Sequence, residues 1–260
     1  MAFTNSKDGT KIGFDRAGQG PPLILVDGAL CSRAFGSMPK FAAKLSGRFT
    51  VFTYDRRGRN ESGDTPPYSV EKEIEDLAAI IREAGGQASV LGISSGAALS
   101  LAAAAGGLPI NKLLLYEAPF MVDAGGHHPP KDCKAQLERL IAAGQRGAAV
   151  KFFIHDMVGA PAFFTVIMRL MPVWSKLKAA AHTLPYDAGI MGDFSLPVAK
   201  ASAVKVPTLV AGGTKSPASM RHAVEALARS IPNAGLEMLP GQTHNVSAAA
   251  LCPVAEKFFA

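Results

Sequence analysis

Several kinds of sequence signal are absent from this chain. Its 260 residues include only three cysteines, Cys31, Cys133 and Cys252, which lie far apart and form no C-x-x-C pair. An odd and low number of cysteines indicates neither a disulfide framework nor a zinc site. No apolar run approaches the length of about 18 residues that marks a transmembrane helix. The polar start, MAFTNSKDGTK, lacks the apolar stretch of a signal peptide, so we expect a cytoplasmic protein with no membrane span.

Charge of one sign is not concentrated in blocks either. The chain has 27 Lys and Arg against 21 Asp and Glu, a net charge of +6, and only Arg56-Arg57-Gly58-Arg59 forms a run. Scattered, mildly basic charge is typical of a solvated surface and not of a nucleic-acid-binding face. We therefore expect a small-molecule partner and no nucleic acid.

The residues that are present favour one α/β domain with a large core, since 48% of the chain is hydrophobic. Apolar or β-branched runs predict strands at 11–15, 22–26, 49–54, 88–91, 112–116, 207–211 and 235–239. Helical spacing or Ala-rich composition predicts helices at 70–84, 95–105, 217–230 and 248–259. Strands separated by helices imply a mostly parallel sheet.

This alternation is interrupted between residues 120 and 200. The interval opens with the sequence GGHHPP at 125–130 and continues as short helical segments without a clear strand. It holds five of the nine methionines and the only tryptophan, Trp174. We predict an α/β core formed by residues 1–120 and 201–260, with a helical cap, or lid, inserted at 121–200.

A candidate nucleophile lies between the expected strand at 88–91 and the following helix. Gly92-Ile93-Ser94-Ser95-Gly96 matches the G-x-S-x-G pattern of a nucleophile elbow, a sharp turn whose flanking residues must be small. The same pattern also arises by chance as a simple turn, but the strand before it and the helix after it favour the elbow. We predict Ser94 as the nucleophile and the Ser95 backbone N–H as an oxyanion donor.

A candidate base follows the last expected strand. Of the six histidines only His244 lies in that loop, in the sequence LPGQTHNV. In a nucleophile-elbow fold the catalytic residues follow in the order serine, acid, histidine. We therefore predict His244 as the general base.

These features, in this order, resemble the α/β-hydrolase superfamily over essentially the whole chain. Val26-Asp-Gly-Ala-Leu30 stands at the place of the family's oxyanion loop, and Leu239-Pro-Gly241 precedes the histidine. The resemblance implies the α/β-hydrolase fold, a mostly parallel sheet flanked by helices with an inserted cap. It also implies that Gly28 or Ala29 supplies the second oxyanion donor. Asp27 replaces the family's common histidine, and we expect its side chain to point away from the hole.

The acid does not stand where most of the superfamily carries it, because Gly212–Met220 contains no carboxylate. Glu117 is the best substitute, since it ends an expected strand 23 residues after Ser94. The sequences Ser94-Ser-Gly-Ala97 and Glu117-Ala-Pro119 resemble the zearalenone-type lactone hydrolases, which implies a Ser94–His244–Glu117 triad. A carboxylate paired with an arginine at the rim is the alternative for Glu117. Weaker candidates for the acid are Asp123, Asp187 and Asp193.

The apolar residues of the predicted cap indicate the substrate class. Some of them seal the cap itself, and the others are expected to face Ser94 and form a mostly apolar pocket. The expected substrate-binding residues are Leu30, Phe153, Met157, Phe164, Met168, Trp174 and Met191. We predict a serine hydrolase of hydrophobic esters or lactones that needs no metal or organic cofactor and is a monomer or homodimer.

Other activities remain open at this stage, because a fold does not determine a reaction. Hydrolysis of C–C bonds, perhydrolysis and cyclisation are compatible with the same residues. A non-catalytic ligand-binding protein is a further alternative, supported by the missing aspartate alone.

Overall fold

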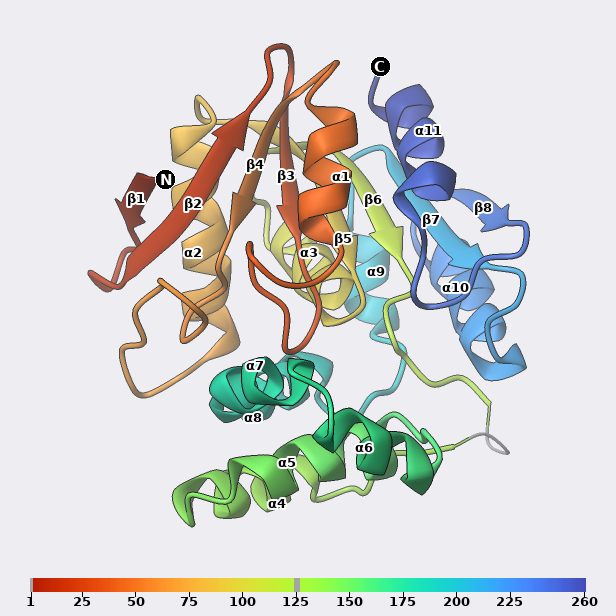
Figure 1. The fold of residues 1–260 in the computed structure, drawn as a ribbon. Coiled ribbons are helices and arrows are strands. Elements are labelled where there is room, and N and C mark those ends of the chain that lie inside the picture. The colour runs from red at the N-terminus through yellow and green to blue at the C-terminus, as the bar shows by residue number, and fades with distance from the viewer. Residues whose placement is uncertain (1, 124–126) are drawn as a thin grey trace.

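The computed structural model describes residues 2–123 and 127–260. Within these residues, eight strands form one sheet in the order β1-β2-β4-β3-β5-β6-β7-β8 (Figure 1). β1 and β2 pair antiparallel with each other and β2 with β4, and all other neighbours are parallel. The strands are β1 (Ala2–Asn5), β2 (Lys11–Ala17), β3 (Pro22–Val26), β4 (Thr50–Tyr54), β5 (Ala88–Ile93), β6 (Ile110–Tyr116), β7 (Thr208–Gly213) and β8 (Gly235–Leu239). The predicted α/β fold with a mostly parallel sheet is confirmed.

Helices cover both faces of the sheet, which explains the continuous apolar strands. Along β3, Ile24 and Val26 enter one hydrophobic cluster and Leu23 and Leu25 the other, because successive side chains point to opposite faces. The first cluster also contains side chains of α2, α3 and α10, and the second those of α1 and α11. These helices are α1 (Met38–Leu45), α2 (Val70–Glu83), α3 (Ser95–Ala105), α10 (Ala218–Ser230) and α11 (Ala248–Phe259).

Further short helices lie below the carboxyl ends of the parallel strands (Figure 1), and we refer to this layer as the cap. They are α4 (Cys133–Ala142), α5 (Arg146–Phe152), the π-helical η1 (Phe153–Met157), α6 (Ala162–Arg169), α7 (Val173–Ala180), the 3₁₀ turn η2 (Ala181–Thr183) and α8 (Leu184–Met191). The predicted boundary at residue 200 falls inside α9 (Val198–Ala203), which packs against α3 and α10 of the core. Residues 124–126, in the predicted opening of the cap, lie outside the described residues.

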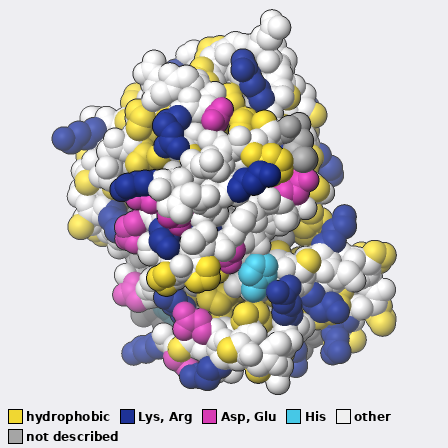
Figure 2. Space-filling view, turned by 90° about the vertical axis from the view of Figure 1, so that its left-hand side faces the viewer, with side chains coloured by type: hydrophobic (Ala, Val, Ile, Leu, Met, Phe, Trp, Pro, Cys, Tyr) yellow, Lys and Arg dark blue, Asp and Glu magenta, His cyan; other side chains and the backbone are white. Residues whose placement is uncertain are grey.

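The outer surface of the cap is partly apolar. On α6 and just after it, Ile167 and Leu170 are exposed, and Figure 2 shows hydrophobic side chains among Lys and Arg in the lower part of the molecule. None of the helices in the described ranges is both long and apolar enough to cross a bilayer.

Candidate active site

Ser94 sits in a strained turn between β5 and α3. Its backbone has φ 58° and ψ −128°, in a region that non-glycine residues rarely adopt. The turn tolerates only small neighbours, because a Cβ atom at Gly92 would lie 2.7 Å from the Gly96 carbonyl oxygen. One at Gly96 would lie 2.3 Å from that of Val26. Close backbone packing around Gly92 and Gly96 therefore fixes the turn that carries Ser94 at the carboxyl end of the sheet.

A cavity of about 360 Å³ opens beside Ser94, between the core and the cap. His244 and Ser94 both line it, as do Ala29 and Ser95. The remaining walls are mostly apolar and come from the cap, from the segment after β6 and from the start of α10. They include Phe120, Met121, Val158, Ala188, Phe194 and Met220, which the sequence analysis did not single out. The segment after β6 could have been anticipated, since ligands of α/β sheets bind at the carboxyl ends of strands.

The cavity separates the predicted substrate-binding residues into two groups. Phe153, Met157 and Met191 line it. In the described part of the chain the lining does not include Leu30, Phe164, Met168 or Trp174. Leu30 is buried in the core with φ 62°, and Phe164 is 47% exposed on the outside of α6. Met168 and Trp174 are partly buried and pack against the first hydrophobic cluster, which contains side chains of both the core and the cap.

Glu117 directly follows β6 and contacts the histidine. Its side chain is fully buried, and its Oε2 lies 2.9 Å from His244 Nδ1. Its Oε1 accepts hydrogen bonds from the Gly213 N–H at 2.7 Å and from the Ser216 hydroxyl at 2.6 Å. Burial alone would raise the pKa of Glu117, but the hydrogen bonds with His244, Gly213 and Ser216 outweigh burial and hold that pKa below its usual value. The carboxylate is therefore ionised and fixed in orientation.

Neighbouring strands also hold the loop that carries the histidine. The Tyr116 hydroxyl donates to the Thr243 carbonyl at 2.7 Å. Gly213 lies against the same loop so closely that a Cβ atom there would approach the Gln242 carbonyl oxygen to 2.2 Å. Because Nδ1 of His244 contacts Glu117, the other ring nitrogen of His244, Nε2, is the one available to a group in the cavity.

The other carboxylates considered for the acid have different partners. Asp123 Oδ2 lies 2.7 Å from His222 Nδ1, and Asp193 accepts hydrogen bonds from Ser195. Asp187 is buried in an ion-pair network described below. Among the described carboxylates, Glu117 is the one that contacts His244.

The loop after β3 approaches Ser94 from the other side. Gly28 is required there, because a Cβ atom would lie 2.9 Å from Ser94 Cβ. The Gly28 N–H donates to Asp27 Oδ1 at 2.8 Å and is therefore engaged. Of the two donors expected on this loop, the Ala29 N–H is the one left without a protein acceptor in the described chain, as is the Ser95 N–H. Asp27 is buried outside the cavity lining, and this burial raises its pKa to about 6.

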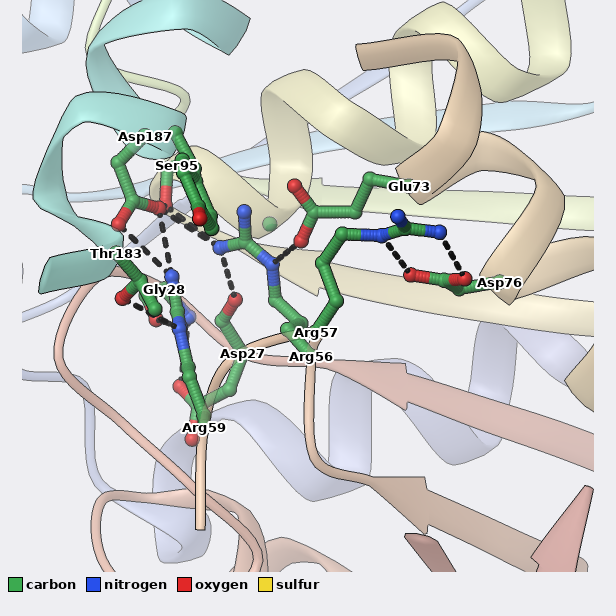
Figure 3. Close-up of polar contacts among 12 residues, drawn as sticks. Asp27, Gly28, Arg56, Arg57, Arg59, Glu73, Asp76, Ser95, Thr183 and Asp187 are labelled. Atoms are coloured by element: carbon green, nitrogen blue, oxygen red, sulfur yellow. Dashed lines mark hydrogen bonds and ion pairs between the residues drawn. The ribbon is translucent and has the colours of Figure 1, made fainter. Parts of the chain in front are cut away.

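The basic run after β4 is buried, which corrects the expectation of a solvated surface. Arg56, Arg57 and Arg59 are each 1% exposed. Buried cations require partners, and Figure 3 shows them: Glu73 for Arg56, Asp76 for Arg57, and Asp187 for both Arg56 and Arg59. Glu73 and Asp76 lie 17 and 19 residues from their arginines, and Asp187 lies 128 residues from Arg59, so the run alone did not indicate them.

The described residues include no group of three or more His, Cys, Asp and Glu side chains placed to hold a metal ion.

Comparisons with known proteins agree with this architecture. A model of the alpha/beta hydrolase family matches residues 23–256. The crystal structure of an alpha/beta hydrolase from Sphaerobacter thermophilus is 49% identical over the whole of both chains, with a TM-score of 0.94. None of the curated proteins matches the chain.

Two more distant structures share the fold. One is the enol-lactonase from Burkholderia xenovorans, 18% identical over 99% of each chain, with a TM-score of 0.75. The other is a thermophilic esterase from Thermogutta terrifontis, 22% identical over 99% of this chain and 97% of that one, also with a TM-score of 0.75. With a family model that spans nearly all of it and a full-length relative at 49% identity, the chain belongs to the α/β-hydrolase family.

Proposed function

We propose that this protein is a serine hydrolase of hydrophobic carboxylic esters or lactones, with Ser94, His244 and Glu117 as its triad. One observation carries the proposal: His244 binds a buried carboxylate through Nδ1 while it lines the same cavity as the strained Ser94. A nucleophile, a base and a group that orients the base are the parts that acyl transfer requires.

The reaction follows from the positions of these groups. His244 Nε2 takes the Ser94 proton as Oγ attacks the carbonyl carbon, and the resulting oxyanion accepts hydrogen bonds from the Ala29 and Ser95 N–H groups. The C–O bond to the leaving group then breaks, and His244 protonates the departing alkoxide. Water, deprotonated by His244, attacks the acyl-enzyme and releases the acid and Ser94. Glu117 keeps the proton on Nδ1 throughout and stabilises the imidazolium.

The cavity supports an apolar substrate. Most of its lining residues are apolar, with Phe, Met and Val side chains among them, and such walls favour hydrocarbon parts of a substrate over sugars or peptides. The names of the structural neighbours, an enol-lactonase and an esterase, belong to the same reaction class. The S-S-G-A and E-A-P sequences, which resemble the zearalenone-type lactone hydrolases, also favour ester or lactone cleavage.

A fluorophosphonate probe tests the nucleophile, because it forms a covalent bond with an activated serine. We expect the wild-type protein to be labelled and Ser94→Ala to remain unlabelled. Ser202→Ala, which changes an exposed serine on α9, is the matched control and should be labelled like wild type. Labelling of Ser94→Ala, or an unlabelled wild type that turns over no ester or lactone, would contradict the proposal.

Aryl esters of graded acyl length and a set of lactones define the substrate class. We expect kcat/KM to rise with apolar acyl length until the cavity is filled. Equal rates for acetyl and longer acyl groups would argue against an apolar acyl site.

A further inference from the structure

We propose that Arg59 is a positioning residue for the oxyanion hole and that Asp187 of the cap helix α8 holds it in place. The inference rests on the proposed function, since it concerns the oxyanion donors of that reaction. It assigns to Arg59 a role beyond packing.

The central contact is between Arg59 and the backbone of the oxyanion loop. Arg59 Nη1 donates to the Gly28 carbonyl oxygen at 2.6 Å. The Gly28 carbonyl and the Ala29 N–H belong to one planar trans peptide group, in which the two bonds point in opposite directions. By holding the carbonyl on the side away from the cavity, Arg59 determines that the Ala29 N–H points toward Ser94. A rotated peptide would present the carbonyl oxygen to the developing negative charge.

The preceding peptide group is held in the same way. Arg56 Nη1 lies 3.3 Å from the Asp27 carbonyl oxygen, and the Gly28 N–H of that peptide donates to Asp27 Oδ1. The guanidinium groups of Arg56 and Arg59 therefore bind two consecutive carbonyl oxygens of the oxyanion loop, those of Asp27 and Gly28. Nearly complete burial of both arginines excludes water as a competing partner for these carbonyls.

Asp187 joins the two sides of the hole (Figure 3). Its Oδ2 and Oδ1 lie 2.8 and 3.0 Å from Arg59 Nη2, and Oδ1 also lies 2.8 Å from Arg56 Nη1. The same Oδ1 accepts a hydrogen bond from the Ser95 hydroxyl at 2.7 Å. The Asp187 carboxylate thus contacts Arg59, which binds the Gly28–Ala29 peptide group, and also the side chain of Ser95, whose backbone N–H is the other oxyanion donor. Because Asp187 belongs to the cap, the cap takes part in building a hole whose donors are all in the core.

The charge states agree with this arrangement. Burial alone would raise the pKa of Asp187, but the Arg59 and Arg56 charges and the Ser95 hydrogen bond outweigh burial, and the pKa lies below its usual value. An ionised Asp187 between two cations is fixed in orientation, as preorganised stabilisation of an oxyanion requires.

Arg57 provides a matched control within the same segment. It is as buried as Arg59 and forms a bidentate pair with Asp76, with N–O distances of 2.7 and 2.6 Å. Its other contacts are with Asp8 and the Lys72 carbonyl, so in the described chain it does not touch the oxyanion loop. A purely structural role of buried arginines predicts similar effects at both positions.

The test compares Arg59→Lys and Arg59→Met with Arg57→Lys and Arg57→Met in the full-length protein. It measures kcat and KM for an aryl ester and the affinity for an alkylboronic acid, which forms a tetrahedral adduct with the serine. One oxyanion donor is worth about 10²–10³ in rate. We expect Arg59→Met to lower kcat and the boronate affinity about 10²-fold with little change in KM. Arg59→Lys should recover part of the loss, because an ammonium group can still donate to the Gly28 carbonyl but cannot keep the ion pair with Asp187 at the same time.

The Arg57 variants should lower the unfolding midpoint and leave kcat near the wild-type value. Asp187→Asn retains the shape of the acid and should lower kcat about tenfold, in parallel with boronate affinity. It decides the question if both Arg59 variants fail to fold, and unchanged kcat in a folded Asp187→Asn would then overturn the proposal.

Folded Arg59 variants with the kcat and boronate affinity of the Arg57 variants would overturn this inference and leave the proposed hydrolase intact. A wild-type protein without Ser94-dependent turnover would instead overturn the proposed function, and this inference with it. The two failures are therefore distinguishable in one set of measurements.

Discussion

The Ser216 hydroxyl donates a hydrogen bond to Glu117 Oε1 over 2.6 Å, between the ends of two neighbouring strands. Glu117 directly follows β6, and Ser216 lies in the loop after β7, where an acid was expected from the superfamily but is absent. The Gly213 N–H of that loop donates to the same oxygen. The loop therefore supplies donors to an acid that comes from the adjacent strand.

Glu117→Gln should abolish most of the activity. Its amide oxygen would accept the hydrogen bonds from Gly213 and Ser216, which turns the NH₂ group toward His244 Nδ1. The imidazole would then carry its proton on Nε2 and could not accept the Ser94 proton. In the serine-protease triad the equivalent change costs about 10⁴ in kcat, and we expect a similar loss with little change in KM. Steady-state kinetics on an aryl ester measure it, with the exposed Glu138→Gln as control. Near-normal turnover would remove Glu117 from the triad.

Ser216→Ala should have a smaller effect of the same kind. One hydrogen bond to a charged group contributes about 1.5–3 kcal/mol, while Gly213 and His244 would still hold the carboxylate. We expect kcat to fall between about tenfold and 10²-fold and the pH profile of kcat/KM to shift. A variant with wild-type kcat would show that Ser216 is dispensable for positioning Glu117.

The cavity wall predicts a contrast between two phenylalanines of the cap. Phe153 lines the cavity, whereas Phe164 is on the outer surface of α6. Phe153→Ala should raise KM for long acyl esters about tenfold or more, because a lost apolar contact is worth about 1–3 kcal/mol, and should affect acetyl esters less. Phe164→Ala should leave both unchanged. Equal KM values for the two variants would contradict the described cavity.

Asp27 predicts a pH dependence of stability. Its folded pKa of about 6 lies above the ordinary value of 3.8, so the native state favours the neutral acid. The protonated Asp27 therefore adds to the free energy of unfolding. This stabilisation is fully present below about pH 4 and is lost as the pH rises through about 6, which lowers the free energy of unfolding by roughly 3 kcal/mol for two pKa units. Asp27→Asn keeps an acceptor for the Gly28 N–H and removes the titration. Urea unfolding between pH 4 and 8 should therefore show the variant gaining stability relative to wild type as the pH rises. Parallel pH curves for the two proteins would show that Asp27 does not titrate in this range.

The sequence was most informative where local pattern determines structure. The expected strand at 22–26 has the observed limits, and the helix expected at 70–84 ends one residue earlier. Glycines on both sides of Ser94 indicated a turn that the structure shows to be closed by backbone contacts. The proximity of Glu117 to the histidine loop could be predicted, because parallel strands end at the same edge of a sheet.

Other features depend on contacts that no local pattern contains. Phe153 and Phe164 are equally apolar, and helical spacing cannot tell which of them faces a cavity and which faces solvent. The burial of the Arg56–Arg59 run could not be predicted from the sequence, because its partner Asp187 follows Arg59 by 128 residues. The engagement of the Gly28 N–H by Asp27 depends on the direction of one peptide group.

The ion pairs between Asp187 and the two core arginines limit how this enzyme can be engineered. A chimaera that received another hydrolase's cap without a carboxylate at this place would leave two buried guanidinium groups without a counter-charge. Such a graft would need compensating replacements of Arg56 and Arg59. Directed evolution of substrate range in this scaffold should therefore vary single cavity-lining side chains and leave the last cap helix in place.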